Sequence, residues 1–594
     1  MRALNLLLTI PLALAAAGPD GEALYKQRCA GCHDGRAQAR MPARDEIAKR
    51  TPEAIYKAMF EGAMVAQSAG LSIEEGRVIA RYLTGKEFGT AGAVTTGKCS
   101  SNPPLQMGDA DWNGWGNDFA NTRYQPKPGI AAEDVPKLKL KWAFAFSGDT
   151  VRSAQPAIVG GRVFTGSASG AVYSLDAATG CVYWTYDAGA QVRTAVAIGK
   201  AASGYVAYFG DVRSTVHAVD AVSGKPLWKV KVEDHPASRV TGAPVFYEGR
   251  VYVPVSSIEE ASAMMPTYEC CKFRGSIVAL DGASGKQIWK SYTVVDPPAP
   301  LKKGETGPQL WGPAGAAVWA SPTIDTKKKV LYAATGNSYT NVSINTSDAI
   351  LAFDLASGSL LWSSQVQPKD NFTMGCGRGV NCPEDRGPDY DFGTSPILRE
   401  LPGGKRVLVC GQKAGVLWGL DPDDKGKVLW QTRVGQGSAL GGIEWGPTAD
   451  SENAYAAVSD LFVRTPPGPG GLHAVKLDTG ETLWTTPPPA LNCTAGAKGC
   501  NGAQSAAISS MPGVVFSGSI DGHLRAFAAK TGAIVWDFNT VQDYQTVNGV
   551  PGKGGSLDSA GPVIAGGMVF TNSGYGMWQG LPGNVLLAFS VDGK

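Results

Sequence analysis

The segment that best predicts the fold is residues 176–184, which read DAATGCVYW. An Asp, then Thr-Gly, then a Trp follow an apolar run there, and this order returns with small variations at residues 220–228, 281–289, 354–362 and 421–430. Asp followed closely by Gly is typical of tight turns, because the Asp side chain bonds nearby backbone and Gly adopts positive φ. We therefore expect one supersecondary unit that repeats along the chain and ends each time on a tryptophan strand.

The repeat closes on itself. Weaker copies at residues 479–484 and 531–536 bring the tryptophan-ended units to seven, and an eighth unit, residues 561–590, ends without its tryptophan strand. A strand that could complete it, LKLKWAF, lies at residues 138–144. Closing the ring with this N-terminal strand removes the free sheet edges. The sequence thus predicts an all-β, eight-bladed β-propeller over residues 105–594.

Composition agrees with many short strands. Of the 594 residues, 76 are Gly and 38 are Pro, which favours strands joined by turns over long helices. The formal net charge of +2 gives no electrostatic reason to expect a nucleic-acid or membrane-surface partner. Residues 87–104, rich in Gly, Thr, Ser and Pro and without hydrophobic periodicity, are expected to form a linker.

The N-terminus has the layout of an export signal. Residues 1–17, MRALNLLLTIPLALAAA, combine a basic start, a short apolar run and small residues at the end. This is typical of a secretory signal peptide. The apolar run is too short for a membrane span, and no later segment approaches the length of one. We expect export to the periplasm, an oxidising compartment in which cysteines form disulfides.

A haem-attachment motif follows, because residues 29–33 read CAGCH. Cys29 and Cys32 have the spacing that forms two thioethers to haem c, and His33 supplies one axial nitrogen to the iron. The alternative, half of a zinc site, lacks a second cysteine pair within the next sixty residues.

The surroundings of this motif resemble a small all-α class I cytochrome c over residues 18–86. One amphipathic helix opens near residue 51 and another ends near residue 83, with a methionine loop between them. Met64 in that loop is the expected second axial ligand, since thioether ligation suits electron transfer. Met41 and Met59 are the alternatives.

The tryptophan repeat resembles that of the quinoprotein alcohol dehydrogenases. The resemblance implies an enzyme that oxidises alcohols with pyrroloquinoline quinone (PQQ) held in the central channel, where Ca²⁺ is shared between quinone and protein oxygens. A metal there acts as a Lewis acid while a carboxylate takes the alcohol proton. Electrons would leave through the haem to an external cytochrome c or the quinone pool.

The resemblance assigns the metal site to two segments. The runs VTGAP and SSIEE are similar to family segments that supply Thr241, Ser257 and the metal-binding Glu260, with Glu259 as the alternative. Asn337, in the run ATGN, matches the Asn whose carbonyl oxygen binds Ca²⁺, a hard ligand suited to that ion.

The run DYDFG, residues 389–393, resembles the catalytic motif of the family. Asp391 is the favoured base and a further candidate metal ligand, and Asp389 is the alternative base. An Asp on either side of the aromatic residue also resembles the lanthanide-using branch, so the resemblance leaves Ca²⁺ and a lanthanide open.

Three further side chains match family positions around the quinone. The resemblance puts Lys413 beside the quinone oxygens, Trp319 beneath the quinone as a stacking ring, and Arg193 at a quinone carboxylate. Each of them alone has an ordinary structural explanation in a propeller. Their occurrence together, in family order over successive blades, supports the functional interpretation.

The cysteines depart from the family, whose adjacent pair lies shortly before the position of Arg193. Here an adjacent pair, Cys270 and Cys271, occurs instead in an insertion after Glu260. By analogy with the family we expect these two to form a disulfide; the alternative is one separate disulfide for each. The other expected pairs are Cys99–Cys181, Cys376–Cys382 and Cys493–Cys500, with Cys410 as a buried thiol.

The haem module precedes the propeller, whereas in most quinohaemoprotein alcohol dehydrogenases it follows. With the runs DWNGWGND, CCKFRGS and TVNGV, this order resembles the cytochrome-fused polyvinyl alcohol dehydrogenases, which oxidise secondary hydroxyls along a polymer. Insertions at residues 258–274, 295–313 and 366–389 are expected at the channel mouth. A dehydrogenase for another small alcohol or sugar, and a non-catalytic scaffold for outer-membrane assembly, are the alternatives.

Overall fold

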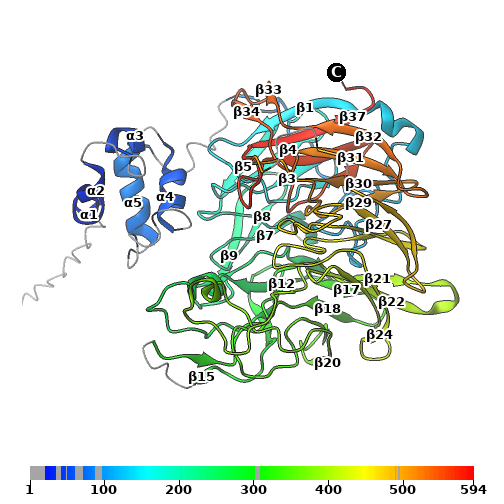
Figure 1. The fold of residues 1–594 in the computed structure, drawn as a ribbon. Coiled ribbons are helices and arrows are strands. Elements are labelled where there is room, and N and C mark those ends of the chain that lie inside the picture. The colour runs from blue at the N-terminus through cyan, green and yellow to red at the C-terminus, as the bar shows by residue number, and fades with distance from the viewer. Residues whose placement is uncertain are drawn as a thin grey trace, which may run out of the picture. The chain divides into compact units, whose positions relative to one another are not determined.

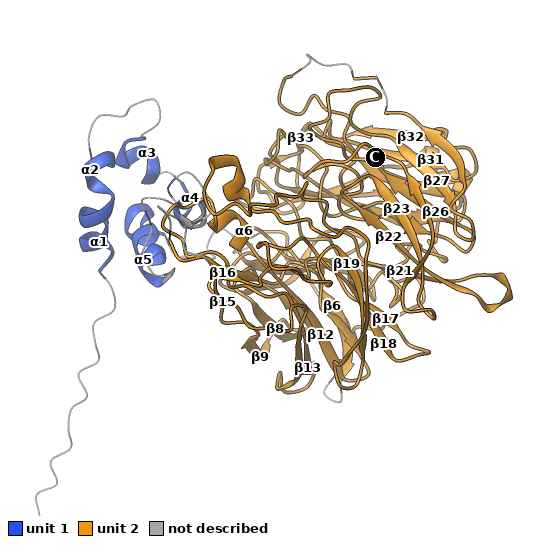
Figure 2. Ribbon diagram, turned by 60° about the horizontal axis from the view of Figure 1, so that its bottom comes forward, with its two compact units in different colours: residues 1–91 blue, residues 92–594 orange. Residues whose placement is uncertain are grey.

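The structure, a computed structural model, has two compact units, residues 1–91 and 92–594 (Figure 2). The residues it describes are 20–34, 42–48, 50–60, 64, 68, 71, 73–86, 96–201, 204–301, 308–488, 490–491 and 496–593. The predicted signal peptide, Met41 and Cys493 lie outside these residues. Within them, no helix is both long and apolar enough to cross a membrane.

The first unit is helical. Its helices are α1 (Gly21–Arg28), α2 (Ala30–His33), α3 (Arg44–Ala48), α4 (Pro52–Phe60) and α5 (Ile73–Thr84). Helix α1 begins at Asp20, whose carboxylate accepts the N–H of Glu22 at 3.0 Å. It packs closely on α5, because a Cβ at Gly21 would lie 2.5 Å from the carbonyl oxygen of Val78. Met59, on α4, is buried in the apolar core of this unit.

The second unit is an eight-bladed propeller of antiparallel sheets (Figure 1). Its first three blades are β2 (Ala157–Val159), β3 (Arg162–Thr165), β4 (Ala171–Asp176) and β5 (Val182–Asp187); β6 (Ala197–Ala201), β7 (Gly204–Gly210), β8 (Thr215–Asp220) and β9 (Pro226–Lys231); and β11 (Val245–Tyr247), β12 (Arg250–Ser257), β13 (Ser276–Asp281) and β14 (Gln287–Tyr292), with the short β10 (Ser238–Arg239) paired to β12. The next two are β17 (Thr323–Asp325), β18 (Val330–Ala334), β19 (Ala349–Asp354) and β20 (Leu360–Gln365); and β21 (Ile397–Glu400), β22 (Arg406–Gln412), β23 (Val416–Asp421) and β24 (Lys427–Arg433).

Two further blades are β25 (Thr448–Ala449), β26 (Asn453–Ala457), β27 (Leu472–Lys476) and β28 (Thr482–Thr486); and β29 (Ser509–Met511), β30 (Val514–Gly518), β31 (His523–Ala528) and β32 (Ile534–Asn539). The eighth is β35 (Val563–Ala565), β36 (Met568–Ser573), β37 (Val585–Ser590) and β1 (Lys139–Ala145). The connections carry α6 (Glu259–Ser262), the β15–β16 pair (Ala299–Pro300 and Trp311–Gly312), the β33–β34 pair (Asp543–Tyr544 and Gly552–Lys553), and the 3₁₀ turns η1 (Ala132–Lys137), η2 (Met374–Arg378) and η3 (Pro402–Gly404).

The ring closes as the sequence predicts. Strand β1 pairs with β37 in antiparallel register, from Lys139 opposite Ser590 to Ala145 opposite Val585, so strands from the two ends of this unit lie side by side (Figure 1). The predicted eight-bladed propeller with a helical domain before it is confirmed.

Each Asp-to-Gly turn of the repeat receives the tryptophan of the preceding blade. Gly180 has φ +75°, and a Cβ there would lie 2.9 Å from the ring of Trp142, whose indole N–H donates to the carbonyl of Ala177 at 3.0 Å. The same docking returns in the next pair of blades, where Trp184 lies on Gly224. Glycine is required at these turns by its positive φ and by the ring against it.

Residues 96–104 belong to the propeller, although we expected a linker over 87–104. Lys98 pairs with Val182, and Cys99 forms a disulfide with Cys181, which anchors this segment to the first blade. The expected disulfides Cys376–Cys382 and Cys270–Cys271 are also formed, and Cys410 is a buried thiol. Because Cys493 lies outside the described residues, its pairing with Cys500 stays a prediction.

The first strands of neighbouring blades contact one another and so surround the centre of the ring. Since each first strand runs antiparallel to the second, the loops that enter first strands and the loops that leave second strands lie at the same end. The insertions 258–274 and 366–389, and the described residues 295–301 and 308–313 of the third insertion, belong to connections of this kind and lie at that end of the propeller.

Candidate active site

Two aspartates and a lysine meet at this end of the propeller. Lys413, in the turn from β22 to β23, places Nζ 3.2 Å from an oxygen of Asp389 and 3.2 Å from an oxygen of Asp391. All three side chains are buried. Burial alone would lower the pKa of Lys413, but the two carboxylates raise it well above its usual value. The ammonium is therefore a fixed positive charge between two acids.

Asn337, directly after β18, joins this cluster. Its backbone N–H donates to Oδ1 of Asp391 at 2.7 Å. Its side-chain nitrogen donates to the carbonyls of Ser338 at 3.0 Å and Phe372 at 2.8 Å. Because the amide nitrogen is committed to backbone, the amide oxygen is the side-chain atom available to a cation.

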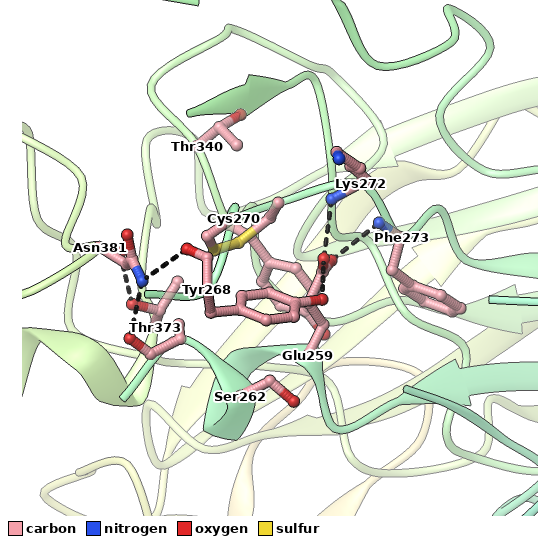
Figure 3. Close-up of a disulfide and its surroundings, with 12 residues drawn as sticks. Glu259, Ser262, Tyr268, Cys270, Lys272, Phe273, Thr340, Thr373 and Asn381 are labelled. Atoms are coloured by element: carbon pink, nitrogen blue, oxygen red, sulfur yellow. Dashed lines mark hydrogen bonds between the residues drawn. A yellow bond between two sulfur atoms is a disulfide. The ribbon is translucent and has the colours of Figure 1, made fainter. Parts of the chain in front are cut away.

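The adjacent glutamates on α6 have different surroundings. The carboxylate of Glu259 is fully buried and accepts the hydroxyl of Tyr268 and the backbone N–H groups of Lys272 and Phe273, each at 2.8 Å (Figure 3). These bonds bind α6 to the loop that carries Cys270, so the oxygens of Glu259 are occupied by protein donors.

Glu260 interacts electrostatically with the charged cluster instead. Burial, and then the negative charge of Asp391, raise the pKa of Glu260 to about 7. The positive charge of Lys413 opposes this rise. A cation bound beside it would relieve this excess of negative charge.

Trp319 lies against the same cluster. Lys413 Nζ is 5.5 Å from the centre of its ring, and Trp445 packs against Trp319 nearly at right angles, with ring centres 5.3 Å apart. A Cβ at Gly393 would lie 2.2 Å from the ring, so the glycine that ends the DYDFG run is needed for this close approach. Thr241 donates to the carbonyl of Trp319 at 3.4 Å.

Arg193 also contacts Trp445. Its guanidinium carbon is 5.0 Å from the centre of that ring, and the indole N–H donates to Asp558 at 2.9 Å. Burial lowers the pKa of Arg193, and its partly buried guanidinium is suited to a carboxylate ligand. The remaining predicted residue, Ser257, contacts the hydroxyl of Tyr339 at 3.4 Å.

Sequence reasoning missed several side chains of this site. Asp370 accepts the N–H groups of Asp389 at 2.9 Å and Tyr390 at 2.6 Å and so shapes the DYDFG loop. Glu444 and Asp558 are buried acids that belong to later blades. The glutamate in the run GGIEW offered a signal, because an acid beside the tight Gly-Gly turn of a buried segment is unusual.

In the helical unit, the haem motif lies on α2. His33 is 7% exposed, and its Nδ1 contacts the carbonyl of Pro42 at 2.8 Å. This bond places the proton on Nδ1 and leaves Nε2 for a metal. Cys29 is partly buried and Cys32 exposed; Met64 and Cys29 pack against the same apolar cluster. The motif, the histidine and the methionine thus belong to one small core.

Comparison with known proteins identifies related families for both units of the chain. Residues 112–436 match the family described as glucose/ethanol/alcohol dehydrogenase, beta-propeller domain, and residues 16–83 match cytochrome C oxidase, cbb3-type, subunit III. The polyvinylalcohol dehydrogenase of a Pseudomonas species is 45% identical, over 97% of this chain and 94% of its own. That of Sphingopyxis sp. strain 113P3 is 43% identical, over 97% and 93%.

The chain belongs to the polyvinyl alcohol dehydrogenase family. It is a PQQ-dependent alcohol dehydrogenase with a cytochrome c domain, which the site geometry and the two family matches support together. This member of the polyvinyl alcohol dehydrogenase family is also similar in fold to solved quinoproteins. The quinohemoprotein alcohol dehydrogenase ADHIIG of Pseudomonas putida HK5 has a TM-score of 0.63 and 20% identity, over 83% of each chain. A europium-containing methanol dehydrogenase has a TM-score of 0.59 and 17% identity, over 82% of this chain and 99% of its own.

Proposed function

We propose that this protein oxidises the secondary hydroxyl groups of polyvinyl alcohol in the periplasm, using PQQ together with a bound cation and passing electrons through haem c to an external cytochrome c or quinone-pool acceptor. The substrate is suggested by the two relatives at 45% and 43% identity. The observation that carries the chemistry is the buried cluster of Asp391, Asn337 and Lys413 in a chain that also has a haem motif.

The residues present fit PQQ, a planar tricarboxylate. Trp319 offers an aromatic face, Lys413 a buried ammonium beside it, and Arg193 a partly buried guanidinium for a carboxylate. When bound, PQQ supplies a two-electron acceptor for the alcohol. Lys413 then stabilises negative charge on the oxygens next to it.

The residues present also fit a hard cation. Glu260, Asn337 and Asp391 supply carboxylate and amide oxygens, the donors that Ca²⁺ and lanthanides prefer. Such an ion supplies Lewis-acid polarisation beside the quinone. The two carboxylates of Glu260 and Asp391 lie close enough to repel each other, and this repulsion supports a bound positive ion.

Asp391 is the proposed base. The backbone N–H of Asn337 and the ammonium of Lys413 hold its two oxygens in place, so its carboxylate is oriented before substrate arrives. It accepts the hydroxyl proton as the substrate carbon gives up hydride. Asp389, which shares Lys413, is the alternative, and the substitution described below separates them.

The helical unit fits haem c. Cys29 and Cys32 would hold the macrocycle through thioethers, His33 through Nε2, and Met64 would be the second axial ligand. Haem there supplies a one-electron carrier, which a two-electron dehydrogenation needs in order to release its electrons singly.

A visible spectrum tests the proposal directly. The exported protein is loaded with PQQ and Ca²⁺, without an external acceptor, and polyvinyl alcohol is added. We expect reduced c-type haem bands that depend on substrate. Reduction by a small secondary alcohol but not by the polymer would contradict the substrate and keep the enzyme class. No reduction by any alcohol, with either Ca²⁺ or a lanthanide, would contradict the proposed mechanism.

A further inference from the structure

One buried acid in the channel has no protein partner for one of its oxygens. Glu444 lies in the loop between β24 and β25 and is 8% exposed. Among the described residues, its Oε2 has no hydrogen-bond partner. Glu259 shows the opposite pattern, since a fully buried structural carboxylate there accepts three hydrogen bonds. An oxygen left unpaired at such a depth is costly unless a ligand contacts it.

The backbone brings Glu444 directly to the charged cluster. The N–H of Ile443 donates to the carbonyl of Gln412 at 3.1 Å, and a Cβ at Gly442 would lie 2.3 Å from the carbonyl oxygen of Lys413. The loop of Glu444 therefore packs on the turn that carries Lys413. On its other side, a Cβ at Gly393 would lie 2.3 Å from the carbonyl oxygen of Glu444.

Glu444 is also the chain neighbour of Trp445, which contacts both Trp319 and Asp558. The ring centres of Trp445 and Trp319 are 5.3 Å apart, and Trp445 donates to Asp558 at 2.9 Å. The charged groups that act on Glu444 are Lys413, Asp558 and Asp391. The side chain thus lies among the residues proposed to hold PQQ.

Its surroundings favour the uncharged form of Glu444 at neutral pH. Burial raises its pKa to about 8, with Lys413 opposing and the negative charges of Asp558 and Asp391 adding to the rise. Burial likewise raises the pKa of Tyr575 well above its usual value, so Tyr575 stays neutral throughout this range. A neutral carboxyl has one O–H donor, whereas a carboxylate has none.

We propose, resting on the function proposed above, that Glu444 is a further catalytic residue: its uncharged carboxyl donates a hydrogen bond from Oε2 to the PQQ oxygen on which negative charge gathers during reduction. With PQQ bound as the hydride acceptor, Asp391 would take the hydroxyl proton of the substrate, and Glu444 would share its own proton without releasing it. A neutral acid beside Lys413 stabilises that charge without repelling it.

Two substitutions test the role. Glu444→Gln keeps the size of the side chain and an N–H donor that does not ionise, and Glu444→Ala removes the donor. In the holoprotein, single-turnover haem reduction by an oxidisable alcohol is expected to fall above about pH 8 in the native chain, where Glu444 becomes a carboxylate. Glu444→Gln is expected to remove this alkaline fall and keep the rate within about 10-fold. Glu444→Ala is expected to slow the reaction about 100-fold at pH 7 and to show no alkaline fall, so that its rate approaches the native rate above about pH 8.

Controls separate this role from folding. Haem content and PQQ affinity of both variants are measured, and Glu452→Gln, an exposed glutamate near β26 in the same blade, is expected to behave as the native chain. A native rate and pH profile in Glu444→Ala would overturn the proposal.

A second readout does not depend on turnover. The absorption of bound PQQ is titrated from pH 6 to pH 10 without substrate, and a transition present in the native protein and lost in Glu444→Gln is expected. Its presence in both proteins, or in neither, would overturn the role of Glu444 whether or not any alcohol reduces the haem. Failure of every alcohol to reduce the haem in the native chain would instead count against the proposed function.

Discussion

At the scale of single residues, the site is a set of buried charges that depend on one another. Lys413 touches Asp389 and Asp391, and Asp391 in turn accepts the backbone N–H of Asn337. Removing one member leaves the others buried and unpaired, which costs more than the lost contact. Substitutions here should therefore keep shape and remove only the charge.

Asp391→Asn is such a change. Because the amide keeps the size of the carboxyl but cannot accept the substrate proton, turnover is expected to fall about 100- to 10,000-fold. Haem content and PQQ binding should stay unchanged, as measured by the haem spectrum and by PQQ titration. Asp389→Asn is the matched comparison, since both aspartates contact Lys413. Full activity of Asp391→Asn with loss in Asp389→Asn would move the role of base to Asp389.

At the scale of elements, the turn glycines control how blades pack. Gly358 has φ +75°, and a Cβ there would lie 2.5 Å from the ring of Trp289 in the preceding blade. Gly249 has nearly the same φ, +76°, but nothing lies within 4 Å of its Cβ position. Both glycines have nearly the same positive φ, but only Gly358 has a tryptophan ring against it.

This pair isolates the docking of tryptophan on glycine. Gly249→Ala is expected to lower the free energy of unfolding by about 1–2 kcal/mol, the cost of a left-handed alanine. Gly358→Ala should lower it by about 1–3 kcal/mol more, because the ring has to move. Denaturant unfolding followed by tryptophan fluorescence measures both. Equal losses at the two positions would show that the ring contact contributes nothing.

At the scale of the whole molecule, disulfides constrain loops of very different length. Cys99–Cys181 spans 82 positions and anchors the entering segment to the first blade, whereas Cys376–Cys382 spans 6. In the chain-entropy account a longer closed loop restricts the unfolded chain more. Replacing both cysteines of the longer loop by serine should cost about 4 kcal/mol, and of the shorter one about 2 kcal/mol. The midpoints of denaturant unfolding compare them, and a larger loss for the short loop would contradict this account.

The repeat, its closure and the haem motif are local patterns, and so the sequence alone determined them. Turn residues and strand alternation are read over a few positions, and counting the units shows that residues 138–144 have to supply the missing strand. The choice between the adjacent residues Glu259 and Glu260 could not be made from local patterns. Which of Glu259 and Glu260 faces the cluster depends on how α6 binds the Cys270 loop, and the position of Glu444 depends on Lys413, Gly393 and Asp558. These groups come from separate blades, and burial and charge arise only when the ring brings them together, so only the tertiary structure decided them.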